Sequence, residues 1–190
     1  VSHCDKNYLL IPSVSSERRR YVPMSFMRKE TIASNLCLII PDAGIYHFGI
    51  LTSAMHMAWM RHVCGRLESR YRYSAKLVYN NFPWPQKAKP AQRARVEQYA
   101  QEVLDIRKQY LDQGNTLADL YDPITMPAAL VKAHRRLDRA VERCYRPQKF
   151  EDDRDRVEHL FELYDQLTSP LAPNGPIRKK RRSRRKSPPS

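Results

Sequence analysis

The chain has 190 residues, of which 42% are hydrophobic and only five are glycine, so it can form one domain or two small ones with modest cores. Its formal net charge of +14 favours a polyanionic partner. No apolar run is long enough to cross a membrane and no signal peptide opens the chain, which predicts a cytoplasmic protein without a membrane partner.

Short apolar runs bounded by proline, serine and asparagine open the chain and predict strands over Asn7–Val14, Arg19–Phe26 and Asn35–Pro41. Residues 46–65 carry apolar side chains at helical spacing and end in a glycine, which predicts one helix that faces the core. A last strand is expected at Ser69–Ser74, just before a cluster of prolines.

Three amphipathic helices with short connections are predicted after Pro85. The first covers Ala91–Leu111, the second starts near Pro127, and the third runs from about Val157 to Leu167. His134 lies on the apolar face of the second helix, and we expect a hydrogen-bonded core histidine there rather than a metal ligand. The three helices predict a small bundle.

The predicted fold class is α+β, with a short-stranded mixed subdomain and its packed helix in residues 1–85 and a small helical bundle in residues 86–168. Residues 169–190 are expected to form a disordered basic tail. Eight of the +14 charges lie in "RKKRRSRRK" (Arg178–Lys186), so the rest of the chain carries +6. The tail would add salt-sensitive, sequence-independent affinity for phosphates. An RNA-binding protein led by this tail would require the folded part to be dispensable.

No metal site is expected, because the four cysteines are widely spaced and none belongs to a Cys-x-x-Cys pair. The stretch "NNFPWP" resembles the catalytic motif [DNS]-P-P-[YFW] of DNA adenine methyltransferases, but Phe82 replaces its first proline. Such enzymes also need a glycine-rich turn to hold S-adenosylmethionine, and the chain has no Gly-x-Gly pattern. We therefore interpret the stretch as an extended segment that docks Phe82 and Trp84, and we assign no catalytic residue.

Three segments of the sequence, residues 11–26, 46–85 and 116–145, closely resemble the C-terminal end of MmeI-like type II restriction–modification enzymes. Those are large single chains with an adenine-N6 DNA methyltransferase core, a target-recognition domain and a terminal helical domain. The resemblance implies that residues 1–85 are the distal part of the target-recognition domain and that residues 86–168 are the helical domain. S-adenosylmethionine would then bind in the complete enzyme and not in this chain.

The resemblance also implies which residues read DNA bases. One coupled pair corresponds to Glu68 and Arg70, which we expect on an extended strand, where residues i and i+2 point the same way. Arginine donates to guanine and a carboxylate accepts from the cytosine amino group, so the pair would read one C·G base pair. The alternative is a surface ion pair worth at most about 1 kcal/mol.

Two further coupled pairs follow from the resemblance: Ser13 with Asn35, and Leu36 with Arg72. Ser13 is shorter than the polar residues usual at its position, so its base pair would be read through water or weakly. Phosphate contacts, which position a protein without specifying sequence, are assigned to the arginine cluster in "SSERRRY". The cluster consists of Arg18, Arg19 and Arg20. A solvated arginine run beside a strand is the alternative.

The sequence thus predicts sequence-specific binding of duplex DNA by the target-recognition part of an S-adenosylmethionine-dependent adenine-N6 methyltransferase or restriction–modification enzyme. Its partners would be duplex DNA and a methyltransferase catalytic domain, in the same chain or in a separate subunit. The alternative is a structural module that packs on the catalytic core without reading bases. A positive strand face that carries Arg70 and Arg72 would favour DNA, whereas an exposed apolar face on the helices would favour docking.

Overall fold

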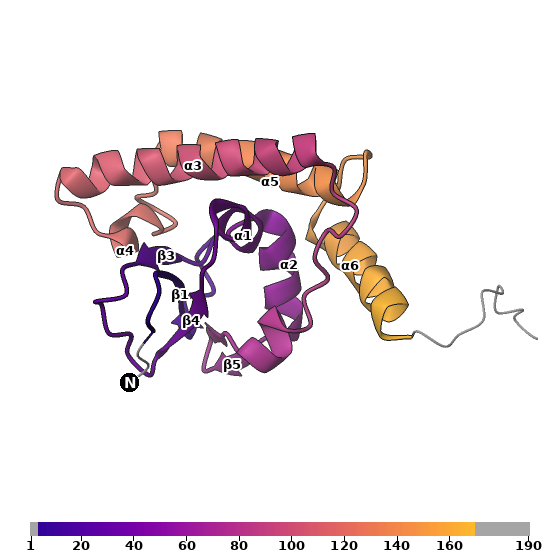
Figure 1. The fold of residues 1–190 in the computed structure, drawn as a ribbon, viewed down its shortest axis with the longest axis horizontal. Coiled ribbons are helices and arrows are strands. Elements are labelled where there is room, and N and C mark those ends of the chain that lie inside the picture. Colours follow the sequence, from indigo (N-terminus) through magenta and orange to yellow (C-terminus); the bar gives the residue numbers. More distant parts are fainter. Residues whose placement is uncertain (1–3, 170–190) are drawn as a thin grey trace, which may run out of the picture.

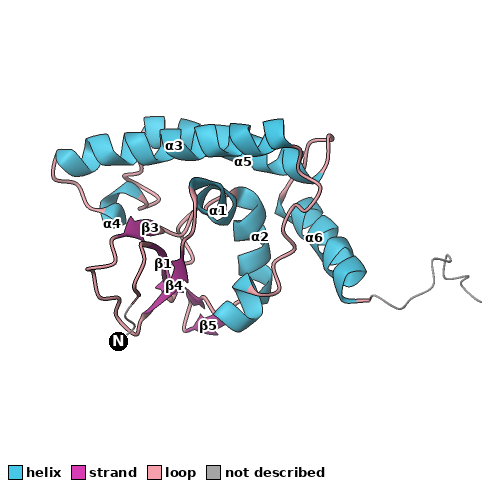
Figure 2. Ribbon diagram, viewed as in Figure 1, coloured by secondary structure: helices cyan, strands magenta, loops and turns pink. Residues whose placement is uncertain are grey.

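Two small antiparallel sheets lie beneath a pair of long helices in the computed structural model, which describes residues 4–169 (Figure 1). The strands are β1 (Tyr8–Pro12), β2 (Val14–Ser15), β3 (Ser25–Met27), β4 (Cys37–Pro41), β5 (Gly65–Leu67) and β6 (Arg70–Arg72). The helices are α1 (Ile45–Leu51), α2 (Ala54–Val63), the π-helical turn η1 (Ala75–Tyr79), α3 (Pro90–Asp112), α4 (Leu117–Leu120), α5 (Ala128–Tyr145) and α6 (Asp153–Thr168). The mixed arrangement confirms the α+β class (Figure 2).

Each sheet has three strands, in the orders β3-β1-β4 and β2-β6-β5. The predicted strand Asn7–Val14 is interrupted at Ser13, so its first part belongs to one sheet and its last residue to the other. The prediction for Arg19–Phe26 is correct only at its end. Tyr21 and Val22 in this stretch bury their side chains against the core without joining a strand, and Pro23 has no N–H to give to a ladder.

The single helix expected over residues 46–65 is wrong, since α1 and α2 are separate helices. Thr52 and Ser53 lie between them, and their hydroxyls donate to carbonyl oxygens of α1 at 2.7 Å. Serine and threonine compete with the helix ladder in this way. Ser53 also accepts from the backbone N–H of His56 at 3.5 Å and so caps α2. Both helices face the core as predicted.

The helices α3 and α5 run antiparallel along one edge of the molecule, whereas α6 lies apart from them and packs mainly on α2 (Figure 1). The part of the chain before α3 also reaches the helix pair, through α1. At Gly49 an added Cβ would lie 2.8 Å from Val96 Cγ1, 3.1 Å from Ala100 Cβ and 3.4 Å from Leu137 Cδ1. The close approach of α1 to α3 and α5 therefore depends on a glycine, and the two segments share one core.

His134 is a fully buried core residue, as predicted. Its ring stacks on Tyr21 with 4.0 Å between ring centroids, and its Nε2 lies 2.9 Å from the hydroxyl of Tyr121. Burial lowers the pKa of His134 to about 3, so the ring is neutral at pH 7.

The four cysteines are free in the structure. Within residues 4–169 no helix is both long and apolar enough to cross a membrane. The expected basic tail, apart from Ser169, lies outside the described residues.

Candidate DNA-recognition surface

Ser13 joins the two sheets through its backbone. Its N–H donates to the carbonyl oxygen of Leu36, just before β4, at 2.9 Å. Its carbonyl oxygen accepts from the N–H of Tyr73, just after β6, at 2.8 Å. Three segments that are far apart in the sequence are therefore held side by side by hydrogen bonds that do not depend on any side chain.

An open groove of about 760 Å³ lies where these segments meet. It is lined by four of the six predicted base readers, Ser13, Asn35, Leu36 and Arg72. These four residues make up two complete coupled pairs implied by the resemblance, so the structure brings both pairs to one place. The role of each residue toward a base stays a prediction.

The side chain of Arg72 lies exposed on the central strand of its sheet, opposite Val14 of β2 and Gly65 of β5. Its guanidinium has no hydrogen bond or ion pair with any residue between positions 4 and 169. Tyr71, the next residue back, points into the core, so the alternation of β6 places Arg70 and Arg72 on the same exposed face. An unpaired guanidinium in an open groove is available to bind an acceptor on a partner.

Glu68 and Arg70 are not both on an extended strand, which corrects the geometry expected from sequence. Glu68 lies in the turn between β5 and β6 with φ of 56°, and Arg70 is the first residue of β6. Arg70 Nη2 donates to Glu68 Oε2 at 2.7 Å, and both side chains are largely exposed. The turn brings the two charges together, whereas the i, i+2 rule for strands does not apply to them.

The turn η1 adds residues to the groove that the sequence did not single out, Lys76 and Leu77. Lys76 is exposed, and Leu77 leaves 51% of its surface uncovered. Leu36 on the other wall is 69% exposed. In the sequence, this part of the surface is marked by Lys76, two residues after the predicted strand Ser69–Ser74. The groove therefore combines cationic side chains with apolar ones, which suits base edges and methyl groups as well as phosphates.

The three arginines assigned to phosphates lie in a turn after β2 and do not line the groove. The backbone of the turn is fixed by hydrogen bonds from Arg18 N to Ser16 Oγ at 3.3 Å and from Arg19 N to Ser16 O at 3.2 Å. Arg20 stacks its guanidinium 5.6 Å from the centroid of the Tyr21 ring. Their contact with phosphates stays a prediction.

The stretch "NNFPWP" has a structural role, as expected. Asn81 Nδ2 donates to the carbonyl oxygens of Lys76 at 2.9 Å and Leu77 at 3.4 Å, and so satisfies the end of η1. Phe82 is buried and meets the ring of Trp84 edge to face at 5.5 Å between centroids. The amide and the rings are thus engaged within the protein.

Neither a metal site nor an S-adenosylmethionine site fits the residues between positions 4 and 169. No group of three or more potential ligands in this part of the chain could hold a metal ion. The sheets are antiparallel and three-stranded, whereas S-adenosylmethionine is held at the ends of parallel strands beside a glycine-rich turn. An open, partly cationic groove formed by loops and short strands is a kind of surface suited to binding a macromolecule.

Comparison with known proteins agrees with this class. Residues 2–86 match the model of the MmeI target recognition domain, and residues 88–172 match that of the MmeI C-terminal domain. The chain therefore belongs to the MmeI family and carries these two domains.

Two similar proteins are much longer than this chain. DNA methyltransferase A of Bacillus subtilis (strain 168) is 48% identical over 168 residues, which are 88% of this chain and 19% of that protein. The Type IIL restriction–modification enzyme MmeI, solved in complex with DNA, aligns with a TM-score of 0.84 and 46% identity over 89% of this chain and 22% of that one. The chain thus spans about a fifth of each relative.

Proposed function

We propose that this chain binds duplex DNA and selects the target sequence for a larger DNA methyltransferase or restriction–modification enzyme. The observation that carries the proposal is the groove in which Ser13, Asn35, Leu36 and Arg72 meet, since the family resemblance implies base reading for all four. Membership of a family named for target recognition, and the likeness to an enzyme solved with DNA, support it.

Arg72 is the central reader in this proposal. Its guanidinium is exposed, has no partner among the described residues, and can donate two parallel hydrogen bonds to the N7 and O6 atoms of guanine. Leu36, its coupled partner, offers an exposed apolar surface at the same groove, where a thymine methyl group or a base edge can pack. Ser13 and Asn35 add polar side chains beside them.

Methyl transfer itself belongs to another part of the complete enzyme in this proposal. The reaction would be adenine-N6 methylation with S-adenosylmethionine as the methyl donor, as the family resemblance implies. The antiparallel sheets described here do not fit that cofactor, so we assign to this chain the binding and selection of DNA alone.

The test is a selection of bound duplexes from a random library with the full chain, followed by sequencing. The wild type should enrich one motif. Arg72→Gln should reduce the discrimination between bases at one position of the DNA site by about 1–3 kcal/mol, which is roughly 5- to 150-fold. The other positions of the site should change little. Arg154→Gln is the matched control, because Arg154 is an exposed arginine on α6 outside the groove. No enriched motif with the wild type, or the same motif with Arg72→Gln, would reject base reading by the groove.

A second candidate function is a structural module that only packs on the catalytic part of the enzyme. Phe161 and Leu167 on α6 favour it, since they are 40% and 47% exposed. Leu167 also lines a hollow of about 210 Å³ together with Trp84 and Tyr145. Under this alternative, Phe161→Ser should weaken assembly with the rest of the enzyme, and the groove variants should leave the methylated sequence unchanged.

A further inference from the structure

The outer face of α5 carries a row of cations that the proposed recognition groove does not use. Lys132, Arg135, Arg139 and Arg143 are all exposed. At 3.6 residues per turn they fall within about 80° of the helix circumference, over a length of about 16 Å. We call this row, together with Arg95 of α3, the α5 basic patch.

None of the five side chains in the α5 basic patch has a hydrogen bond or ion pair within residues 4–169. The two acidic residues of α5 are engaged with other partners, although Glu142 lines the same hollow as Arg139 and Arg143. Asp138 is buried and accepts from Tyr21, while Glu142 is buried and paired with Arg156 of α6 at 2.6 Å. The amphipathic pattern of α5 thus separates its charges by sign, with the anions inside and the cations outside.

Two hollows widen the patch at the end of α5. Arg139 and Arg143 line one of about 330 Å³, and Arg143 with Arg95 lines the other, of about 190 Å³. Beyond the helix the charge is mixed, since the next hollow is lined by the cations Arg146, Lys149 and Arg154 together with four carboxylates. The row on α5 is therefore followed by a region of mixed charge.

Such a row works against the stability of the free protein. Like charges at positions i and i+4 of a helix repel each other, and Arg135, Arg139 and Arg143 are spaced in this way. On α6, by contrast, Arg154 is paired with Glu158 four residues later. An unpaired arginine row without apolar anchors is suited to phosphates, whereas the centre of a protein–protein interface is depleted of charge and rich in large apolar side chains.

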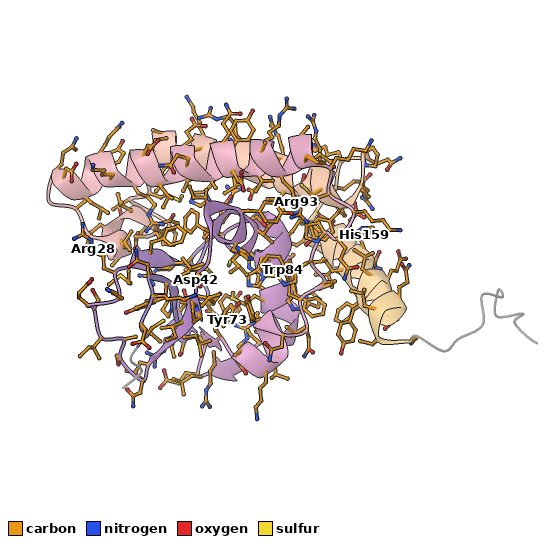
Figure 3. All side chains as sticks on the ribbon, in the orientation of Figure 1. Arg28, Asp42, Tyr73, Trp84, Arg93 and His159 are labelled. Atoms are coloured by element: carbon orange, nitrogen blue, oxygen red, sulfur yellow. The ribbon has the colours of Figure 1, made fainter. Side chains whose placement is uncertain are left out.

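We propose that the α5 basic patch is a second, sequence-independent binding surface for the sugar–phosphate backbone of duplex DNA. The inference rests on the proposal that the chain binds duplex DNA. Figure 1 places the α3–α5 pair along one edge of the molecule and β5, which lines the groove, at the opposite edge. Figure 3 shows nitrogen-tipped side chains projecting from the outer side of the helix pair. Because the two surfaces lie at opposite edges, we infer that the patch holds a separate DNA segment or one that bends around the molecule.

The salt dependence of binding to a random-sequence duplex tests the inference with the full chain. Each phosphate contact contributes about 0.9 to the slope of the logarithm of affinity against the logarithm of salt concentration. The triple variant Arg135→Gln, Arg139→Gln, Arg143→Gln should reduce the slope by about 2 to 3. Glutamine keeps a high helix propensity, and removal of the repulsion should leave the melting temperature unchanged or raised.

The control removes the same charge elsewhere, as Lys29→Gln, Lys87→Gln, Lys108→Gln, three exposed lysines outside the patch. The control should reduce the slope by less than 1. Equal reductions by both triple variants would mean a diffuse effect of net charge and would overturn the inference. Loss of the selected motif in the patch variant would also overturn it, because the patch would then belong to the reading surface. An unchanged slope together with weakened assembly of the complete enzyme would assign the patch to an acidic protein surface instead.

The salt-dependence experiment is independent of the selection experiment that tests the groove. Failure of base reading shows as the absence of an enriched motif, whereas failure of the second surface shows as equal salt slopes for the two triple variants. Arg72→Gln should change the motif and reduce the slope on random duplex by less than the patch variant does.

Discussion

The carboxylate of Asp138, on α5, accepts a hydrogen bond of 2.6 Å from the phenol of Tyr21, which lies 117 residues earlier in the chain. Its other oxygen accepts from the backbone N–H of Ala54, the first residue of α2, at 2.7 Å. One buried carboxylate thus ties the helical segment to α2 and to the stretch that follows the three arginines. Burial raises the pKa of Asp138 to about 6, although the hydrogen bonds from Tyr21 and Ala54 oppose that shift.

We predict that Asp138 makes stability depend on pH. Its folded pKa lies above the unfolded value of about 3.8, so its stabilising contribution is complete below pH 4 and is lost as the pH rises to 6. Asp138→Asn keeps an acceptor for Ala54 and offers an amide to the oxygen of Tyr21. The free energy of unfolding of the variant, relative to wild type, should therefore rise by roughly 3 kcal/mol between pH 4 and pH 7.

Urea unfolding at a series of pH values measures this difference. Asp165→Asn, at an exposed position of α6, is the control and should give a difference that does not vary with pH. The buried histidines are present in both proteins, so their contribution cancels when the wild-type free energy of unfolding is subtracted from that of the variant. A flat difference for Asp138→Asn as well would show that the carboxyl does not titrate in this window.

A reversal of the charges at Glu68 and Arg70 should reverse a base preference. Both side chains are exposed, and the ion pair that joins them across the turn is 2.7 Å long. Because an exposed ion pair is weak, little energy is needed to redirect both side chains toward a base pair. Arg70→Ala should cost roughly 1–3 kcal/mol of discrimination at one position. The double variant Glu68→Lys with Arg70→Asp should change the preference from C·G to G·C, and either single reversal should bind both sequences poorly.

Methylation-site mapping in the complete enzyme reads out that prediction. Glu17 and Arg66 supply a matched control, since they form another exposed ion pair at the same sheet, at 3.6 Å. Exchange of their charges should leave the methylated sequence as it is. If the double variant at Glu68 and Arg70 keeps the original base, the two residues are a surface ion pair and no more.

Substitution of Gly49 by alanine should destabilise the whole chain. The new Cβ would lie 2.8 Å from Val96 Cγ1, and a branched side chain held in a packed core moves only at a cost. The clash should cost about 1–3 kcal/mol, and the gain in helix propensity offsets at most about 1 kcal/mol of it, so a net loss of stability is expected. Gly44→Ala is the control, because its Cβ would meet nothing closer than 3.9 Å. Thermal unfolding of the two variants gives the comparison, and a single transition lowered only in Gly49→Ala supports one shared core.

The chain by itself should transfer no methyl groups. Asn81 has its amide on two carbonyl oxygens of η1, and Phe82 and Trp84 pack against each other, so none of them is placed to hold a flipped-out adenine. Incubation with labelled S-adenosylmethionine and duplex DNA should give only background incorporation. Asn81→Ala should instead lower stability by about 1 kcal/mol, because it leaves helix-end carbonyls without a partner. Incorporation above background that disappears in Asn81→Ala would contradict this interpretation.

Hydrophobic periodicity alone was sufficient to predict the long helices and their buried faces. The stripe of Leu130, His134, Leu137 and Val141 is buried in α5, because a regular spacing of apolar residues places them on one side of any helix they form. The pattern could not show the break at Thr52 and Ser53. There the hydroxyls bond to the backbone and a carboxylate from α5 meets the start of α2, which depends on packing.

The family could be inferred from the sequence, but the groove could not be assembled from it. Ser13, Asn35 and Arg72 are far apart along the chain, and only the ladders β1–β4 and β2–β6, with the two backbone bonds of Ser13, place them together. The sequence likewise did not show that Glu68 lies in a turn, since no glycine or asparagine marks it. The packing of α6 on α2 could not be predicted from the sequence either. Periodicity determines which face of a helix is buried, whereas the shape of the remaining core determines which element covers that face.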